Sequence, residues 1–366
     1  MRIIIVNKEI LQNRPPVLST LLSLSDLGHD VSIVCVDINE YWKKELVKRG
    51  IEYYIIPEKK KRDKISKIIE YLSFKRKVLS YLEEKVGDKH TFLWVIGGNT
   101  IYCLGESIKS YNYILQIQEL HENDNRYKHV FSKVINDAKA VFVNEYNRAC
   151  LFQCWFKMPT RPFVIPNKPY SLIEEQICTN VLNRFEGVLK PLKDKKIILY
   201  QGGIKHIRKL DRIALAMKKM NVNYHLLVVG PEQESGLINE LKNITPEVTH
   251  IGFIPSPEYL AFCKVAHIGY VAYEPNSLNN IYCAPNKIFE YSAFGLPMIA
   301  NDIPGLRYTI GVSGACELVE PTEVNSIVNG LIKIENNYLE YKENSNNFYN
   351  SVDNQKIFSD VLMRIQ

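Results

Sequence analysis

Short apolar runs alternate with amphipathic stretches along most of this chain, and this alternation constrains the fold more than any other feature. The apolar runs are typical of buried strands, and the stretches between them have helical periodicity. The alternation therefore predicts βαβ units and an α/β fold with parallel sheets. The predicted strands are 3–6, 31–36, 51–56, 92–96, 113–117, 140–143 and 163–165 in the first half, and 197–200, 225–229, 250–253, 268–272, 297–300 and 317–319 in the second.

The pattern breaks once, at a proline-containing stretch from Pro166 to about Ser171, and a fresh strand begins at Ile197. A chain of 366 residues can bury two separate cores. We expect two Rossmann-like domains over residues 1–170 and 190–340, the first joined by a C-terminal helix over 355–366. Since ligands bind at the carboxyl ends of strands in such sheets, two facing domains would enclose an interdomain cleft.

Composition excludes several classes of protein. The chain is 46% hydrophobic and 23% charged, which is ordinary for a globular protein. No apolar run reaches the length of about 18 residues that a membrane span needs, and the N-terminus is typical of a buried strand rather than a signal peptide. The eight cysteines form no C-x-x-C pair, so we expect buried thiols and no metal site. These features predict a cytoplasmic protein.

Positive charge is concentrated in the first half of the chain, at 58–64 and 74–77, within a net charge of +6. One interpretation is a solvated surface. The other is a patch at the inner face of the cell membrane, where each basic residue gains about 1 kcal/mol from an anionic surface. Nucleic acid is a poor candidate partner, because no aromatic residues interleave with the charges.

The segment 283–300 carries the strongest chemical pattern. Pro285 suits a first helical turn, and the free N–H groups that follow, from Asn286 on, can hold a phosphate. Lys287 adds positive charge there, and Glu290 lies on the same helix face. A structural alternative is an amphipathic helix that only packs into a core.

The loop at 200–211 is a second candidate. Gly202 and Gly203 follow a strand and allow the backbone to approach a ligand closely. Arg208 can contact phosphate oxygens in a bidentate manner, with Lys209 as its substitute.

The segment ending E-Y-S-A-F-G-L-P-M-I-A resembles the nucleotide-binding motif of GT-B glycosyltransferases of family 4, the glycosyl transferases group 1. The resemblance implies that Glu290 binds the donor's ribose, that amides at the helix start hold the pyrophosphate, and that Arg208 stabilises the leaving diphosphate. Many members carry another glutamate near the donor sugar. Tyr282 stands near that place here, so the stereochemical outcome is not implied.

Weaker matches to the same family occur along the rest of the chain. Gly230 ends a strand, and Phe253 lies in a loop that resembles the base-reading loop. Asn280 and Tyr282 are candidate sugar contacts. In the first half, His121 and Glu122 resemble a pair placed near the acceptor, where a neutral histidine or a carboxylate can serve as base, although a structural pair is an alternative. Asn13 and Asn99 follow strands and would border the same cleft.

The resemblance implies a metal-independent enzyme that transfers a hexosyl or N-acetylhexosaminyl group from a nucleotide-sugar, with UDP expected, to a saccharide or lipid-linked saccharide. Synthesis of a surface polysaccharide is the expected role, and no cofactor besides the donor is needed. A non-catalytic nucleotide-sugar-binding subunit and a sugar-nucleotide epimerase remain alternatives. A dehydrogenase is disfavoured, because no G-x-G-x-x-G follows the first strand.

Overall fold

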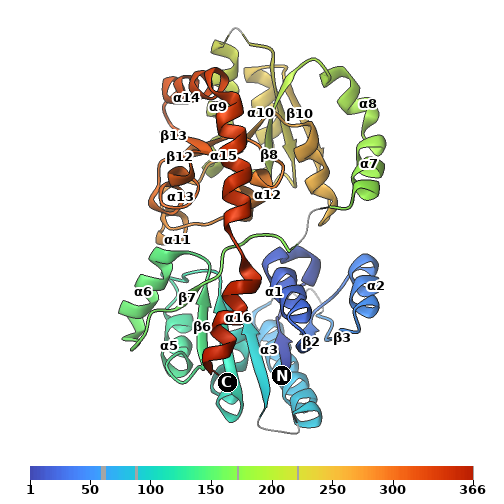
Figure 1. Cartoon of the computed structure of the whole chain (residues 1–366), viewed down its shortest axis with the longest axis vertical. Helices are drawn as coiled ribbons and strands as arrows, with labels where there is room; N and C mark the ends of the chain where they lie inside the picture. The colour runs from blue at the N-terminus through green and yellow to red at the C-terminus, as the bar shows by residue number, and fades with distance from the viewer. Residues whose placement is uncertain (59–62, 87–89, 171–172, 221, 366) are drawn as a thin grey trace. The chain divides into compact units, whose positions relative to one another are not determined.

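The computed structural model describes residues 1–58, 63–86, 90–170, 173–220 and 222–365. The chain divides into two compact units, and each contains its own parallel sheet with helices packed on it (Figure 1). The first unit comprises Met1–Tyr170 and Asp353–Gln366, and the second comprises Ser171–Val352. The predicted α/β fold with two Rossmann-like domains is confirmed.

The sheet of the first unit has seven strands in the order β3-β2-β1-β4-β5-β6-β7. Ile3 of the central strand pairs with Val31 on one side and with Phe92 on the other. Since helices cover both faces, the strands are nearly continuous apolar runs, and β4 is buried along its whole length. The strands are β1 (Arg2–Val6), β2 (Asp30–Cys35), β3 (Glu52–Ile55), β4 (Thr91–Ile96), β5 (Asn112–Ile117), β6 (Ala140–Val143) and β7 (Phe163–Val164).

The last helix of the chain, α16 (Asn354–Ile365), packs against the sheet of the first unit beside α1 (Pro15–Asp26) (Figure 1). The ring of Phe358 is fully buried, 5.5 Å from Trp94 and 5.7 Å from Phe142. The other helices of this unit are η1 (Leu11–Asn13), α2 (Glu40–Lys48), α3 (Lys64–Lys85), α4 (Gly98–Leu104), η2 (Gly105–Ser110), α5 (Asn125–Val134) and α6 (Tyr146–Phe156).

The sheet of the second unit has six strands in the order β10-β9-β8-β11-β12-β13. Its strands are β8 (Lys196–Gln201), β9 (Tyr224–Val229), β10 (Val248–Gly252), β11 (Ile268–Val271), β12 (Met298–Asn301) and β13 (Cys316–Val319). Its helices are α7 (Glu175–Arg184), α8 (Glu186–Leu189), η3 (Lys190–Leu192), η4 (His206–Arg208), α9 (Leu210–Lys219), α10 (Leu237–Ile244), η5 (Glu258–Val265), α11 (Leu278–Ile281), α12 (Asn286–Ser292), α13 (Pro304–Arg307), η6 (Gly311–Ser313), α14 (Val324–Asn336) and α15 (Tyr338–Ser351).

Helix α12 is fixed to this sheet by the side chain of Tyr291. A Cβ on Gly269 of β11 would lie 2.3 Å from the Tyr291 ring, so only glycine leaves room for it. The backbone N–H of Gln201, at the end of β8, donates to the Tyr291 hydroxyl at 3.0 Å. The helix that carries Lys287 and Glu290 is therefore held against the carboxyl ends of the central strands.

One helix of the second unit forms where helix propensity is low. In the Asn- and Tyr-rich stretch 336–354, α15 occupies most of the residues. Its tertiary contacts outweigh the low helix propensity of asparagine, since Ser345 donates to the Leu296 carbonyl at 2.8 Å and Phe348 stacks 5.2 Å from Phe289.

We predict that Phe358→Ala lowers the free energy of unfolding of the first unit by about 3–5 kcal/mol, because it removes a fully buried ring from between two others. All three tryptophans of the chain, Trp42, Trp94 and Trp155, lie in this unit. Tryptophan emission during urea titration therefore measures its unfolding. Met363→Ala on the same helix is the matched control, since Met363 is 65% exposed. Equal losses in the two variants would contradict this packing.

Candidate functional site

Three glycines that the sequence singles out lie where strands of the second unit end. Gly202 and Gly203 follow β8, and Gly230 follows β9. Asn301, the last residue of β12, lies at the same kind of position. The strands are parallel and in register, with Gln201 paired to Val229. Their carboxyl ends therefore meet at one edge of the sheet, which is where α/β sheets bind ligands.

Two glycines bring the first two strand ends into direct contact. Gly202 and Gly230 have φ angles of 127° and 146°, which other residues rarely adopt. A Cβ on Gly230 would lie 2.1 Å from the carbonyl oxygen of Gly202. Gly203 is less restricted, because its added Cβ would meet only the flexible side chain of Gln233. Glycine is thus required at 202 and 230 by the backbone itself.

Lys287 is a buried cation at this edge. Its side chain is 8% exposed, and its Nζ lies 4.3 Å from the centre of the Tyr200 ring and 5.5 Å from that of Tyr273. Within the described residues, no oxygen accepts a hydrogen bond from this ammonium group and no carboxylate pairs with it. Burial, and next the positive charge of Arg208, lower the pKa of Lys287 from 10.5 to about 7.

Arg208 is a second cation beside the same tyrosine. Its Cζ lies 4.0 Å from the centre of the Tyr273 ring, and its Nη1 reaches the Ala272 carbonyl at 3.4 Å. Its Nε is buried and has no hydrogen-bond partner among the described residues. The structure thus brings Lys287 and Arg208 together around Tyr273, and neither cation forms an ion pair with a carboxylate among the described residues. The charge of Glu290 acts on Lys287 from one helical turn away.

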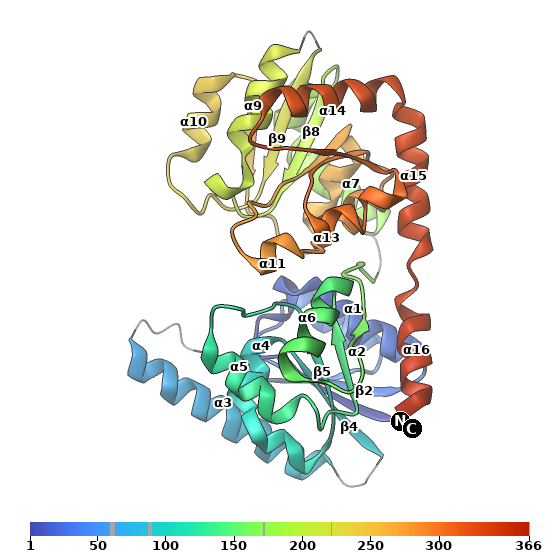
Figure 2. The same ribbon diagram turned by 90° about the vertical axis from the view of Figure 1, so that its left-hand side faces the viewer.

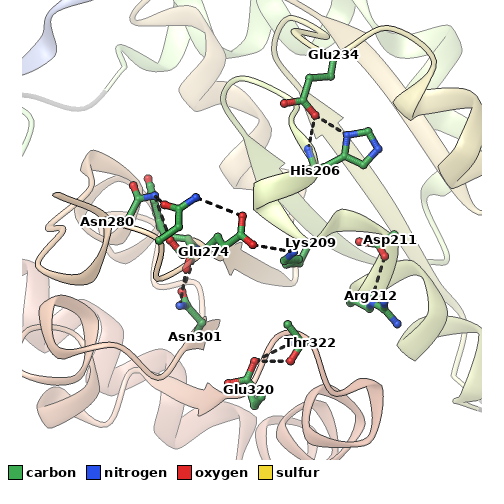
Figure 3. Close-up of polar contacts among 12 residues, drawn as sticks. His206, Lys209, Asp211, Arg212, Glu234, Glu274, Asn280, Asn301, Glu320 and Thr322 are labelled. Atoms are coloured by element: carbon green, nitrogen blue, oxygen red, sulfur yellow. Dashed lines mark hydrogen bonds and ion pairs between the residues drawn. The ribbon is translucent and has the colours of Figure 1, made fainter. Parts of the chain in front are cut away.

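Polar contacts fix the loops that carry these groups (Figure 3). Asn301 is buried, accepts from the Tyr273 N–H at 3.0 Å and donates to the Tyr273 carbonyl at 2.8 Å. The carboxylate of Glu234 accepts from the backbone N–H of His206 at 2.8 Å and lies 2.5 Å from its Nδ1. Since His206 begins the 3₁₀ turn that ends at Arg208, these bonds limit the movement of the arginine.

Lys209 and Asn280 have structural partners instead. Lys209 forms an ion pair with Glu274 at 3.5 Å, and its φ of 51° places it in the left-handed region (Figure 3). The amide nitrogen of Asn280 donates to the Glu274 carbonyl at 3.1 Å and to Asn276 at 2.9 Å. These bonds occupy both of its N–H groups, so only the Asn280 oxygen could contact a sugar.

Glu290 lies one turn after Lys287 and is 3% exposed. Its Oε1 accepts a hydrogen bond from the hydroxyl of Tyr259. Burial raises the pKa of Glu290 to about 7, and the bond from Tyr259 and the charge of Lys287 only partly oppose that rise. A second carboxylate oxygen remains for a ligand hydroxyl.

The start of α12 differs from the prediction. Pro285 is not in the first helical turn but is the N-cap residue, with φ −71° and ψ 152°, and the helix begins at Asn286. Extended backbone is natural for a cap and is compatible with the fixed φ of proline. The helix has seven residues, so the side chains of Lys287 and Glu290 carry more of the site's chemistry than a helix dipole can.

Two further predicted residues lie at the margin of this group. Phe253 is 64% exposed just after β10, and the preceding Gly252 carbonyl accepts from the Gly230 N–H at 2.7 Å. Tyr282 is half-buried at the end of α11.

The first unit contains a separate group around Asn99. The Oδ1 of Asn99 accepts from the hydroxyls of Tyr71 and Tyr127 at 2.8 and 2.5 Å. The imidazole of His121 stacks on Tyr127 with the ring centres 4.2 Å apart. His121 has a φ of 51°, a left-handed conformation that costs about 1–3 kcal/mol for a residue other than glycine. Burial lowers its pKa, so the ring is neutral at pH 7.

Two more predicted residues lie in this unit. Glu122 is half-buried next to His121, and its charge partly opposes the fall in the pKa of that histidine. Asn13 is exposed in η1.

Metal ligands do not cluster anywhere in the described parts of the chain, where no group of three or more His, Cys, Asp or Glu could hold an ion. All eight cysteines are free thiols, and six of them are buried. The prediction of buried thiols is wrong for Cys154, which is exposed, and Cys150 is only half-buried.

Three site residues were missed by sequence reasoning, namely Tyr200, Tyr259 and Tyr273. Each tyrosine is next to an apolar run, so its ring resembles ordinary core material in the sequence. Their position could have identified two of them, because Tyr200 and Tyr273 lie within two residues of the carboxyl end of a strand, where ligands bind in such sheets.

Comparison with known proteins finds a family match within the second unit. Residues 195–337 match the model of the family described as glycosyl transferases group 1. No curated protein matches the chain.

Three solved structures share its fold over the whole chain. Sucrose-phosphate synthase from Thermosynechococcus elongatus is 16% identical, with a TM-score of 0.69 and 97% of that chain covered. Anabaena HepE in complex with UDP-glucose is 11% identical, with a TM-score of 0.72 and 99% covered. UDP-GlcNAc 2-epimerase from Neisseria meningitidis bound to UDP-GlcNAc is 14% identical, with a TM-score of 0.62 and 100% covered. In each case 100% of the present chain is covered.

The resemblance to glycosyl transferases group 1 is confirmed over residues 195–337, which match the model of that family, and the chain has the GT-B fold of two Rossmann-like domains.

Proposed function

We propose that this protein transfers a hexosyl or N-acetylhexosaminyl group from a UDP-sugar to a saccharide or lipid-linked saccharide acceptor. The observation that carries the proposal is the buried ammonium of Lys287, which forms no hydrogen bond or ion pair with a described residue and lies beside Arg208. Burying an unpaired charge is costly. A diphosphate between the two cations would remove that cost.

Charge stabilisation is the chemistry that these residues would supply. When the bond between the sugar and the diphosphate breaks, negative charge develops on the leaving phosphate oxygens. Lys287 and Arg208 would stabilise it from fixed positions, which is the most effective form of electrostatic catalysis. The tyrosine rings exclude water and strengthen the interaction. Two such cations would make this role independent of a metal ion, and no cofactor besides the donor takes part.

Recognition of the nucleoside would use Glu290. Its free carboxylate oxygen can accept hydrogen bonds from ribose hydroxyls, while Tyr259 holds the other oxygen. Two of the similar solved structures contain a UDP-sugar, which supports UDP as the nucleotide. Phe253, exposed at the end of β10, would contact the base.

The acceptor would bind at the group around Asn99 in the first unit. Neutral His121 can accept a proton or a hydrogen bond, and the neighbouring carboxylate of Glu122 is the candidate general base. Asn13 and Asn99 would contact the acceptor sugar. We propose a role in surface polysaccharide synthesis, at the inner face of the cell membrane.

Direct assay of the reaction tests this function. We predict that the purified protein binds UDP-sugars, seen as a rise in melting temperature with ligand concentration, and releases UDP when an acceptor is present. Arg208→Ala should lower turnover by about 100-fold or more through lost charge stabilisation. Mass spectrometry of the donor incubated alone separates transfer from epimerisation. Binding without any release or isomerisation would instead indicate a non-catalytic subunit.

We predict that Lys287→Met stabilises the ligand-free protein by about 1–2 kcal/mol and weakens UDP-glucose binding by at least about tenfold. Because burial lowers the folded-state pKa of Lys287 to about 7, the charged form destabilises the fold. This cost is full below pH 7 and fades as pH rises toward 10.5, where the unfolded chain also loses its proton. The stabilisation should therefore be greatest at or below pH 7.

Chemical denaturation and calorimetry measure the two effects. Lys242→Met, at an exposed position on α10, is the matched control. A Lys287 variant that is destabilised at pH 7, or that binds UDP-glucose like the control, would exclude an unpaired buried cation.

We also predict that UDP-glucose affinity has a maximum near pH 7. Below that pH Glu290 becomes protonated and accepts fewer hydrogen bonds, and above it Lys287 loses its charge. Calorimetry from about pH 5.5 to about pH 9 measures the profile. Glu290→Gln should remove the fall on the acid side and keep the fall on the alkaline side. An acid side unchanged in this variant would show that Glu290 does not bind the ribose.

A further inference from the structure

The N-terminal half of α3 exposes a line of large apolar side chains. Their spacing of three and four residues places them on one side of the helix, and we call them the α3 stripe. Its members, with their exposed fractions, are Ile65 (72%), Ile68 (61%), Ile69 (59%) and Leu72 (62%). A contiguous exposed stripe of this kind marks an interaction surface.

The stripe is not the face by which α3 packs on its own unit. Phe74 and Val78 are buried and lie roughly opposite the stripe at 100° per residue. Figure 2 shows α3 along the outer margin of the first unit, with its N-terminal end projecting. The helix therefore has two apolar sides. Only the side with Phe74 and Val78 packs into the core of the first unit, and the α3 stripe stays exposed.

Charge around the stripe identifies the kind of partner. From Ile65 to Lys77 the helix carries four basic residues and one acidic residue, Glu70. At 100° per residue, exposed Arg76 lies on the side of the stripe and half-buried Lys75 lies next to it, whereas Lys67 lies on the opposite side. A protein partner would have to supply several carboxylates around an apolar groove. An anionic bilayer offers both components at once, acyl chains for the stripe and acidic headgroups for the cations.

No helix in the described parts of the chain is long and apolar enough to cross a membrane, so α3 could only lie along the surface. The predicted basic cluster at 58–64 falls mostly on residues 59–62, which lie outside the described residues.

We propose that the α3 stripe inserts into the interface of an anionic membrane, with Lys75 and Arg76 contacting the headgroups. Tyr71 precedes Leu72, and its hydroxyl donates to Asn99 at 2.8 Å. A membrane-bound α3 thus lies directly beside the group around Asn99. Access of a lipid-linked acceptor to that group rests on the proposed transferase function, whereas membrane binding does not.

Co-sedimentation of the full chain with vesicles tests the proposal. The probe is phosphatidylcholine vesicles with about 30% phosphatidylglycerol, compared with phosphatidylcholine alone. Ile68→Ser with Leu72→Ser should weaken binding on the order of 100-fold, because two inserted side chains are lost. Val312→Ser with Leu339→Ser removes equally exposed apolar side chains from the second unit (72% and 79% exposed) and should bind like the unaltered protein.

The contribution of charge is tested separately. Lys75→Gln with Arg76→Gln should weaken binding on the order of 30-fold and lower its dependence on salt. Absence of binding to anionic vesicles, or equal binding by the stripe variant and its control, would overturn the proposal. So would a lipid-free dimer that the stripe variant dissociates, because the stripe would then pair two copies of this chain. Since the assay contains no nucleotide, its failure leaves the donor site untouched.

Discussion

The contact between the Lys287 ammonium and the Tyr200 ring is the interaction on which the candidate site depends. The face of the Tyr200 ring attracts the positive charge of this buried lysine. Burial strengthens this attraction, because it keeps water away from the ammonium group. The contact also joins helix α12 to the end of β8. Burial of the charge lowers the stability of the free protein, and a bound anion would remove that penalty. Such a conflict between stability and function is common at functional sites.

Most of the surrounding structure serves to hold that lysine in place. Gly269 leaves space for Tyr291, which fixes α12 to the sheet. On the outer side, Phe348 of α15 stacks on Phe289 of the same short helix. Asn301 holds the backbone of Tyr273, and Tyr273 in turn contacts Arg208. A site built in this way is largely preorganised, so little ordering remains when a ligand binds.

The sequence was a good guide to the sheets and a poorer one to contacts between distant residues. Strands were predictable because parallel strands buried on both faces are continuous apolar runs. Lys287 and Glu290 could be found from their spacing on one helix, but their burial and shifted pKa values depend on Tyr200 and Tyr259, which are far away in sequence. Helix α15 was missed because its stability comes from packing and not from propensity. The α3 stripe was missed for another reason, since an apolar helix pattern does not say which side packs on its own domain.

Titration of Lys287 itself tests the central claim most directly. Lysine labelled with ¹³C at Cε gives one NMR signal per side chain, and Lys287→Arg assigns the signal in question. A buried cation without an anionic partner predicts a pKa of about 7 in the free protein, which rises toward the ordinary value of 10.5 when UDP-glucose is bound. A pKa near 10.5 in the free protein, unchanged by the nucleotide-sugar, would contradict the account.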